Sequence, residues 1–83
     1  MADTKVGEVI HFYDKISVAI VKLAGELKVG DTVKFKQGDT EFDQVVQSME
    51  IDHHSVETGK VGDEVGIKVD QKAKPGATVY SFA

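Results

Sequence analysis

Three glycines, each placed three residues before a strand-forming valine, constrain the fold of this chain more than any other feature. They begin the segments Gly30 to Val33, Gly62 to Val65 and Gly76 to Val79, and the first two copies share the longer pattern Val-Gly-Asp-x-Val. Glycine adopts positive φ without a steric penalty, and the following aspartate can accept backbone N–H groups that a tight turn leaves unpaired. The spacing therefore predicts sharp turns that each lead into a short strand.

Segments rich in β-branched and aromatic residues lie between these turns and are expected to be strands. They span residues 6–13, 16–23, 33–36, 41–52, 64–70 and 77–82, with a loop expected over residues 53–63. The parity of the apolar residues changes near Val45, which predicts a bulge or bend there. On the outer parity of the fifth segment lies Gly66, where another group can approach the backbone closely.

Six short antiparallel strands predict an all-β fold, specifically a small six-stranded antiparallel Greek-key barrel. Closure removes the two exposed edges that an open sheet of this size would keep. The chain has 83 residues and no cysteine, so residues 1–83 are expected to form one domain stabilised by packing rather than by disulfides.

The charge and the hydropathy pattern limit the classes of partner. The net charge of −4 argues against tight, purely electrostatic binding of RNA or DNA, which requires a strong positive field. No apolar run approaches the roughly 18 residues that a bilayer span needs. A soluble, cytoplasmic protein without a membrane partner is expected.

Two stretches of the chain resemble the second domain of translational GTPases, the β-barrel that follows the nucleotide-binding domain in elongation factor Tu and elongation factor 1-alpha. They are LKVGDTVKF at Leu27 to Phe35 and VVQSMEIDHHSVETGKVGDEVGIKV at Val45 to Val69. The resemblance implies a translation-factor-like binding module that recognises a translation-associated RNA, such as tRNA or the ribosome, or a translation-associated protein. The family's ligand-facing positions correspond to a rim of five residues: Glu50, Asp52, His53, His54 and Glu64.

A GTPase site is not expected, because the chain has no Gly-x-x-x-x-Gly-Lys-Ser/Thr motif. The nearest sequence, Gly59-Lys60, is followed by Val61 and so provides neither a phosphate cradle nor a hydroxyl group for magnesium. We therefore expect no nucleotide hydrolysis by that mechanism.

Metal binding and catalysis are both disfavoured by the arrangement of the candidate residues. Asp52, His53 and His54 are zinc-ligand types, but neighbouring residues at a strand end point to opposite faces, and only His11 could add a fourth ligand. His54 is followed by Ser55, yet sequence adjacency does not create nucleophile–base geometry, and no oxyanion motif surrounds the pair. The sequence predicts a non-enzymatic protein without catalytic residues, metal or cofactor.

Four lysines on the second and third predicted strands and the turn between them could form an edge that contacts RNA or another partner. Outward lysines also protect sheet edges from pairing with other chains, and the sequence leaves both interpretations open. The residues are Lys22, Lys28, Lys34 and Lys36.

The sequence keeps two further functions open beside the translation-related binding module. One is an accessory or adaptor domain that docks on a separate enzyme, because collagenase-like peptidases of the prokaryotic type carry a similar barrel at their C-terminal end. In that case the lysine-rich edge or an apolar patch would form the interface. The other is a metal-dependent enzyme, which would require the histidines to converge on one ion.

Overall fold

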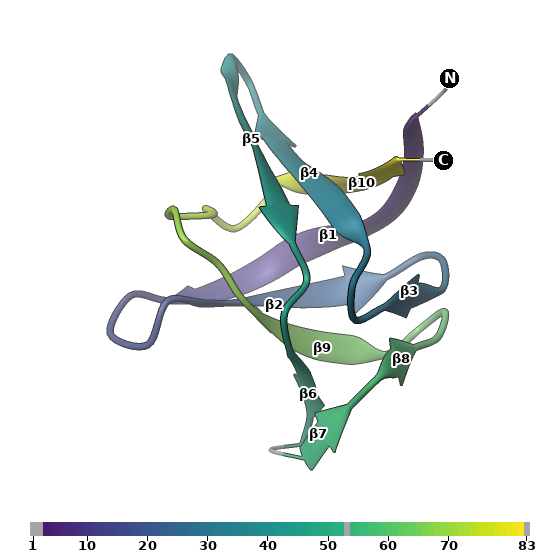
Figure 1. Cartoon of the computed structure of the whole chain (residues 1–83). Helices are drawn as coiled ribbons and strands as arrows, with labels where there is room; N and C mark the ends of the chain where they lie inside the picture. The colour runs from purple at the N-terminus through teal and green to yellow at the C-terminus, as the bar shows by residue number, and fades with distance from the viewer. Residues whose placement is uncertain (1–2, 53, 83) are drawn as a thin grey trace.

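The computed structural model describes residues 3–52 and 54–82, and every regular element in that part of the chain is a strand (Figure 1). The all-β prediction is therefore confirmed. The strands are β1 (Asp3–Tyr13), β2 (Val18–Leu23), β3 (Leu27–Lys28), β4 (Thr32–Gln37), β5 (Thr40–Val45), β6 (Met49–Ile51), β7 (His54–Val56), β8 (Thr58–Gly59), β9 (Glu64–Lys68) and β10 (Thr78–Phe82).

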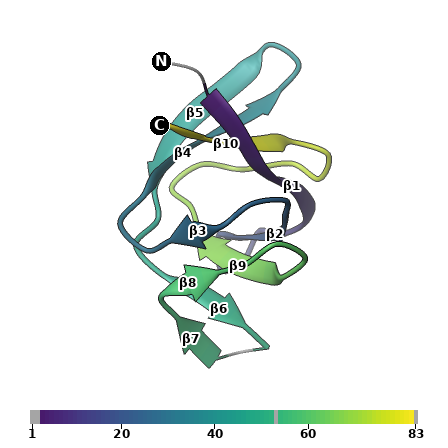
Figure 2. The same cartoon turned by 90° about the vertical axis from the view of Figure 1, so that its right-hand side faces the viewer.

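Eight of these strands form one antiparallel sheet in the order β5-β4-β10-β1-β2-β9-β6-β7. The remaining two, β3 and β8, pair with each other as a small second sheet, which faces the viewer in Figure 2. Strand β1 is central, as expected for a segment with apolar residues on both faces. Its first residue, Asp3, pairs with Phe82 of β10, so the two ends of the described chain lie side by side.

The large sheet must curl, because only a few residues connect β5, at one end of the sheet, to β6, the last strand but one at the other end. Strands β5 and β6 are six positions apart in the sheet, which would separate them by about 29 Å if the sheet were flat. Only residues 46–48 connect them, and the four steps from Val45 to Met49 reach at most about 14 Å. The inner face is therefore wrapped around the core (Figure 1).

A closed six-stranded barrel is not confirmed. The hydrogen-bonded ladder of the large sheet has two ends, β5 and β7, among the described residues. The predicted 41–52 strand is divided into β5 and β6 at the bend anticipated near Val45, and the predicted 53–63 loop contains β7 and β8. Strands of two or three residues are too short to show an apolar repeat, so the sequence pattern could not predict them.

Bulges explain why β1 carries apolar residues on both parities. Its register shifts between Lys5 and Gly7 against β10, and between Val9 and His11 against β2. Each extra residue reverses the side to which the following side chains point. Val6 and Val9 are buried as a result, and Phe12, three residues further on, packs against the same core.

The glycine turns form as predicted. Gly30, Gly62 and Gly76 have φ values of 100°, 91° and 95°. In the first turn the Asp31 carboxylate accepts the N–H of Lys28 at 3.0 Å, and in the second the Asp63 carboxylate accepts the N–H of Lys60 at 2.9 Å.

The core is apolar and, among the described residues, includes one buried polar side chain. Gln44 is 5% exposed, donates to the carbonyl oxygen of Val45 and accepts the N–H of Asp70 at 2.8 Å, which links β5 to the segment after β9. No helix long and apolar enough to cross a bilayer occurs in the described ranges. The buried apolar residues are Val6, Val9, Ala19, Val21, Leu23, Leu27, Val33, Phe35, Val46, Met49, Val65, Ile67, Val69, Ala73, Ala77 and Val79.

Candidate functional site

A groove of about 460 Å³ lies on the outer face of β1, β2, β9 and β6, on the side of the sheet away from the core. We call it the acidic groove, because apolar side chains line its floor and three carboxylates lie along it. Its lining residues are Tyr13, Ile16, Val18, Ile20, Glu50, Asp52, Glu64 and Gly66.

Gly66 lies in the floor of the groove, and its lack of a side chain leaves the groove open there. Gly66 of β9 lies in register with Ile20 on one side and with Glu50 on the other. A Cβ atom at this position would lie 3.2 Å from Cγ1 of Val18 and 3.4 Å from Cδ1 of Ile20. These aliphatic side chains therefore lean over the glycine, which is the close approach that the sequence predicted.

Two unusually exposed apolar side chains lie at one end of the groove. Ile16 is 60% exposed and Tyr13 is 47% exposed. Ile16 was expected to begin the second strand, but it lies in the 14–17 turn, where Ser17 has φ 55°. The Tyr13 ring makes an edge contact with His11, with 4.6 Å between the ring centroids. Exposed apolar side chains beside a hollow are typical of a protein-binding surface.

The carboxylates lie on the opposite wall and at the far end of the groove. Glu50 is in register with Gly66, and Glu64 comes two residues before Gly66 on β9. The two glutamates are therefore diagonal neighbours, whose Cα atoms are about 7–8 Å apart in such a pair. Asp52 follows β6 in a turn and has φ 51°. Lys22 faces both Glu64 and Glu8 in register and offsets part of this charge.

The structure brings three of the five predicted rim residues, Glu50, Asp52 and Glu64, into one groove. His54 is exposed on β7, opposite Ile51, and does not line the groove. His53 lies outside the described residues. Ligand binding by these residues stays a prediction.

The arrangement of His54 and Ser55 gives no support to nucleophilic catalysis. They are consecutive on β7, so their side chains point to opposite faces of the strand. Within residues 3–52 and 54–82, no three His, Cys, Asp or Glu side chains are grouped so that they could hold a metal ion.

The four predicted lysines do not lie along one edge of the sheet. Strands β10 and β1 separate β2, which carries Lys22, from β4, which carries Lys34 and Lys36, and Lys28 belongs to the small sheet. The partners in register with Lys34 and Lys36 on β5 are Asp43 and Glu41. Each of these two lysines therefore faces an acidic residue across the strands, and contact with RNA or a partner stays a prediction.

The aliphatic side chains of the groove were not among the predicted site residues. A signal for them exists, since Ile16, Val18 and Ile20 occupy one parity while the core residues Ala19 and Val21 occupy the other. A strand that is apolar on both faces needs a second covering surface or leaves one face exposed. Here the second face is the groove floor.

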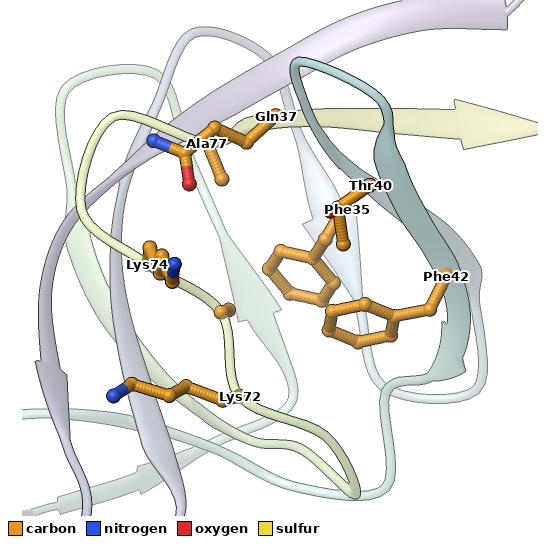
Figure 3. Close-up of a pocket in the computed structure, with 8 residues that line it drawn as sticks. Phe35, Gln37, Thr40, Phe42, Lys72, Lys74 and Ala77 are labelled. Carbon is orange, nitrogen blue, oxygen red and sulfur yellow. The ribbon is translucent and has the colours of Figure 1, made fainter.

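A second hollow, of about 290 Å³, lies between the β4–β5 hairpin and residues 72–77, and Figure 3 shows the residues that line it. The rings of Phe35 and Phe42 stack with their centroids 5.0 Å apart. The Gln37 side-chain amide donates to the carbonyl oxygen of Pro75 at 3.0 Å and ties the hairpin to the loop. We call it the phenylalanine pocket, and its contacts mainly hold two segments of this chain together.

Comparison with known proteins finds a sequence match to part of a protease and a fold match to one domain of a peptidase. No protein-family model matches it. An uncharacterized protease of Methanocaldococcus jannaschii is 40% identical over 77 residues, which are 92% of this chain and 19% of the protease. The chain thus spans about a fifth of the length of the relative it matches.

Two solved structures share the fold, both of the C-terminal domain of a Geobacillus thermoleovorans protein described as a U32 peptidase. One crystal structure superposes with a TM-score of 0.89 at 18% identity, covering 96% of this chain and 93% of the domain. The selenomethionine variant gives 0.86 at 19% identity, covering 90% and 95%. The chain therefore has the fold of that all-β peptidase domain.

The resemblance to translation factors is wrong, because the related sequence and the matching structures come from peptidases. The Val-Gly-Asp turns that suggested it have a geometric explanation. Each is closed by an aspartate carboxylate beside a glycine with positive φ, and small antiparallel folds of any function can use such a turn. The chain is therefore not identified as an elongation-factor domain. The matches also give no support to a translation-associated RNA or protein partner.

Proposed function

We propose that the chain acts as one non-catalytic accessory module that docks on a peptidase of the U32 type. The observation that carries this proposal is the extent of the sequence match, which covers 92% of this chain but only 19% of the M. jannaschii protease. A match of this kind is expected when the chain corresponds to one module of a longer enzyme. The C-terminal domain of the G. thermoleovorans protein, a unit of similar extent, was crystallised on its own.

The chemistry of the exposed residues supports a binding role over a catalytic one. The groove combines carboxylates with exposed aliphatic and aromatic side chains, and the described residues that line it include no serine, cysteine or histidine. A hydrolytic site needs a nucleophile or activated water, a base and a stabiliser for the developing oxyanion. An apolar surface next to fixed charges is better suited to recognising another polypeptide.

A binding experiment tests the docking proposal. The M. jannaschii protease is prepared without the segment that aligns with this chain, and the 83-residue chain is titrated into it by isothermal calorimetry. We expect one-to-one association with a dissociation constant on the order of micromolar, typical of a small interface. The intact protease serves as the control and should bind more weakly, because its own module occupies the docking site.

The same samples test whether the module is catalytic. Peptide hydrolysis is measured for the chain alone, for the shortened protease and for their mixture. We expect no turnover by the chain alone and a faster rate for the mixture than for the shortened protease. Absence of association in the calorimeter, or hydrolysis by the isolated chain, would contradict the proposed function.

A further inference from the structure

We propose that the acidic groove binds an extended segment of the peptidase in which an aliphatic residue and an arginine or lysine are separated by one residue, so that both side chains point into the groove. The aliphatic side chain covers Gly66, and the cationic group lies between Glu50 and Glu64. This inference rests on the proposed function and specifies the surface and the chemistry of the docking.

The apolar half of the groove accounts for the aliphatic residue. Its volume of about 460 Å³ is within the range of pockets that bind small ligands, and the floor is formed by Val18, Ile20 and Gly66. Ile16 and Tyr13, 60% and 47% exposed, stand at one end and lose contact with water when the site is filled. Removal of this apolar surface from water supplies a driving force that opposes the entropic cost of association.

The carboxylates account for the cationic residue. The diagonal separation of Glu50 and Glu64, about 7–8 Å, allows one ammonium or guanidinium group to contact both carboxylates. Glu8 and Lys22 extend the row beyond Glu64, and Lys68 follows Gly66 by two residues on the same parity. Even without Glu8, the groove has three carboxylates against the two neighbouring lysines. This excess of negative charge favours a basic occupant and disfavours an anionic one such as a nucleic acid.

Charge reversal tests the cationic half of the proposal. Glu50→Lys and Glu64→Lys are compared with Glu41→Lys, an exposed glutamate on β5 outside the groove that gives the same change in net charge. With the shortened protease as the titrant, we expect the dissociation constant to rise at least tenfold for each groove variant. The Glu41→Lys variant should stay within about twofold of the unmodified chain.

Truncation of an exposed aliphatic side chain tests the apolar half. Ile16→Ser should weaken binding at least fivefold, whereas Val45→Ser, a 47% exposed valine on β5, should leave it within about twofold. Both positions are exposed, so circular dichroism and thermal unfolding should show that both variants fold.

The outcomes separate this inference from the proposed function. If the unmodified chain binds the shortened protease but the groove variants bind as well as the controls, docking stands and the groove assignment is overturned. Equal weakening by Glu41→Lys and Glu50→Lys would show a general effect of net charge and would also overturn it. Failure of the unmodified chain to bind overturns both.

Discussion

At the scale of single residues, a missing side chain at Gly7 sets how closely β1 and β2 approach. A Cβ atom there would lie 2.6 Å from Cγ1 of Val21 and 2.8 Å from the backbone oxygen of Lys22. The backbone oxygen cannot rotate away as the end of a flexible side chain can. Any side chain at Gly7 must therefore displace part of the sheet.

We predict that Gly7→Ala lowers the free energy of unfolding by about 1–3 kcal/mol, the usual cost of overpacking. Gly25→Ala is the matched control, because a Cβ atom at Gly25 would meet only ordinary contacts of 3.7–3.9 Å. Urea denaturation of both variants measures the difference. Equal stability of the two variants would show that β1 and β2 are less closely packed than the structure indicates.

Gln44 is the second residue whose loss should be costly. Its side chain is 5% exposed, and its Oε1 atom accepts the N–H of Asp70. We predict that Gln44→Met, which keeps the shape but removes the acceptor, lowers the free energy of unfolding by about 1–3 kcal/mol because the partly buried N–H loses its partner. Gln47→Met, at an exposed position three residues later, should change it by less than about 0.5 kcal/mol. A smaller effect at Gln44 than at Gln47 would contradict this assignment.

At the scale of elements, the two Val-Gly-Asp turns are built alike. In each, the aspartate carboxylate accepts one backbone N–H, while its own N–H donates to the carbonyl oxygen of the same lysine, Lys28 or Lys60. The turns lead into β4 and β9, whose valines Val33 and Val65 are fully buried. Loss of a carboxylate should therefore loosen the entry to a core strand.

We predict that Asp31→Ala and Asp63→Ala each lower the free energy of unfolding by about 0.5–1.5 kcal/mol, the net value of one hydrogen bond. Asn at either position keeps an oxygen acceptor and should restore most of the loss. Asp39→Ala, in the turn between β4 and β5, is the control for removing a negative charge from a turn. Equal losses for Ala and Asn would show that the charge matters and the hydrogen bond does not.

The elements were predicted well from the sequence where a residue type favours one backbone conformation or one hydrogen bond. Gly30, Gly62 and Gly76 have the expected positive φ, and Asp31 and Asp63 accept the expected N–H groups. Segments too short to show periodicity, β3, β7 and β8, could not be predicted. In the candidate site the carboxylates were named, but the apolar floor was not, because Ile16, Val18 and Ile20 resemble core residues until the packing of β2 is known.

At the scale of the whole molecule, β3 and β8 hold the curled sheet together. The chain leaves β3 for β4 and β8 for β9, so their pairing, Leu27 with Gly59 and Lys28 with Thr58, joins distant parts of the large sheet. Leu27 is fully buried beneath this contact. The apolar pattern within a single strand does not indicate a pairing between two short segments far apart in the sequence. Without this pairing, a single closed barrel was the simplest fold to expect from the sequence.

We predict that Leu27→Ala lowers the free energy of unfolding by about 2–5 kcal/mol, the usual cost of a cavity in a core. Lys28→Ala, at the exposed neighbouring position of β3, should cost less than about 1 kcal/mol. Chemical denaturation followed by circular dichroism measures both. A small loss for Leu27→Ala would mean that the β3–β8 sheet is dispensable for the fold.

Docking of the module on a peptidase through the acidic groove is tested most directly by nuclear magnetic resonance of the 9.0 kDa chain. Nitrogen-15-labelled chain is titrated with the unlabelled M. jannaschii protease that lacks its matching segment. We expect docking through this groove to shift or broaden the amide signals of Ile16, Ile20, Glu50 and Gly66 first, while those of the β4–β5 hairpin stay in place. Unchanged spectra, or changes confined to the hairpin, would contradict it.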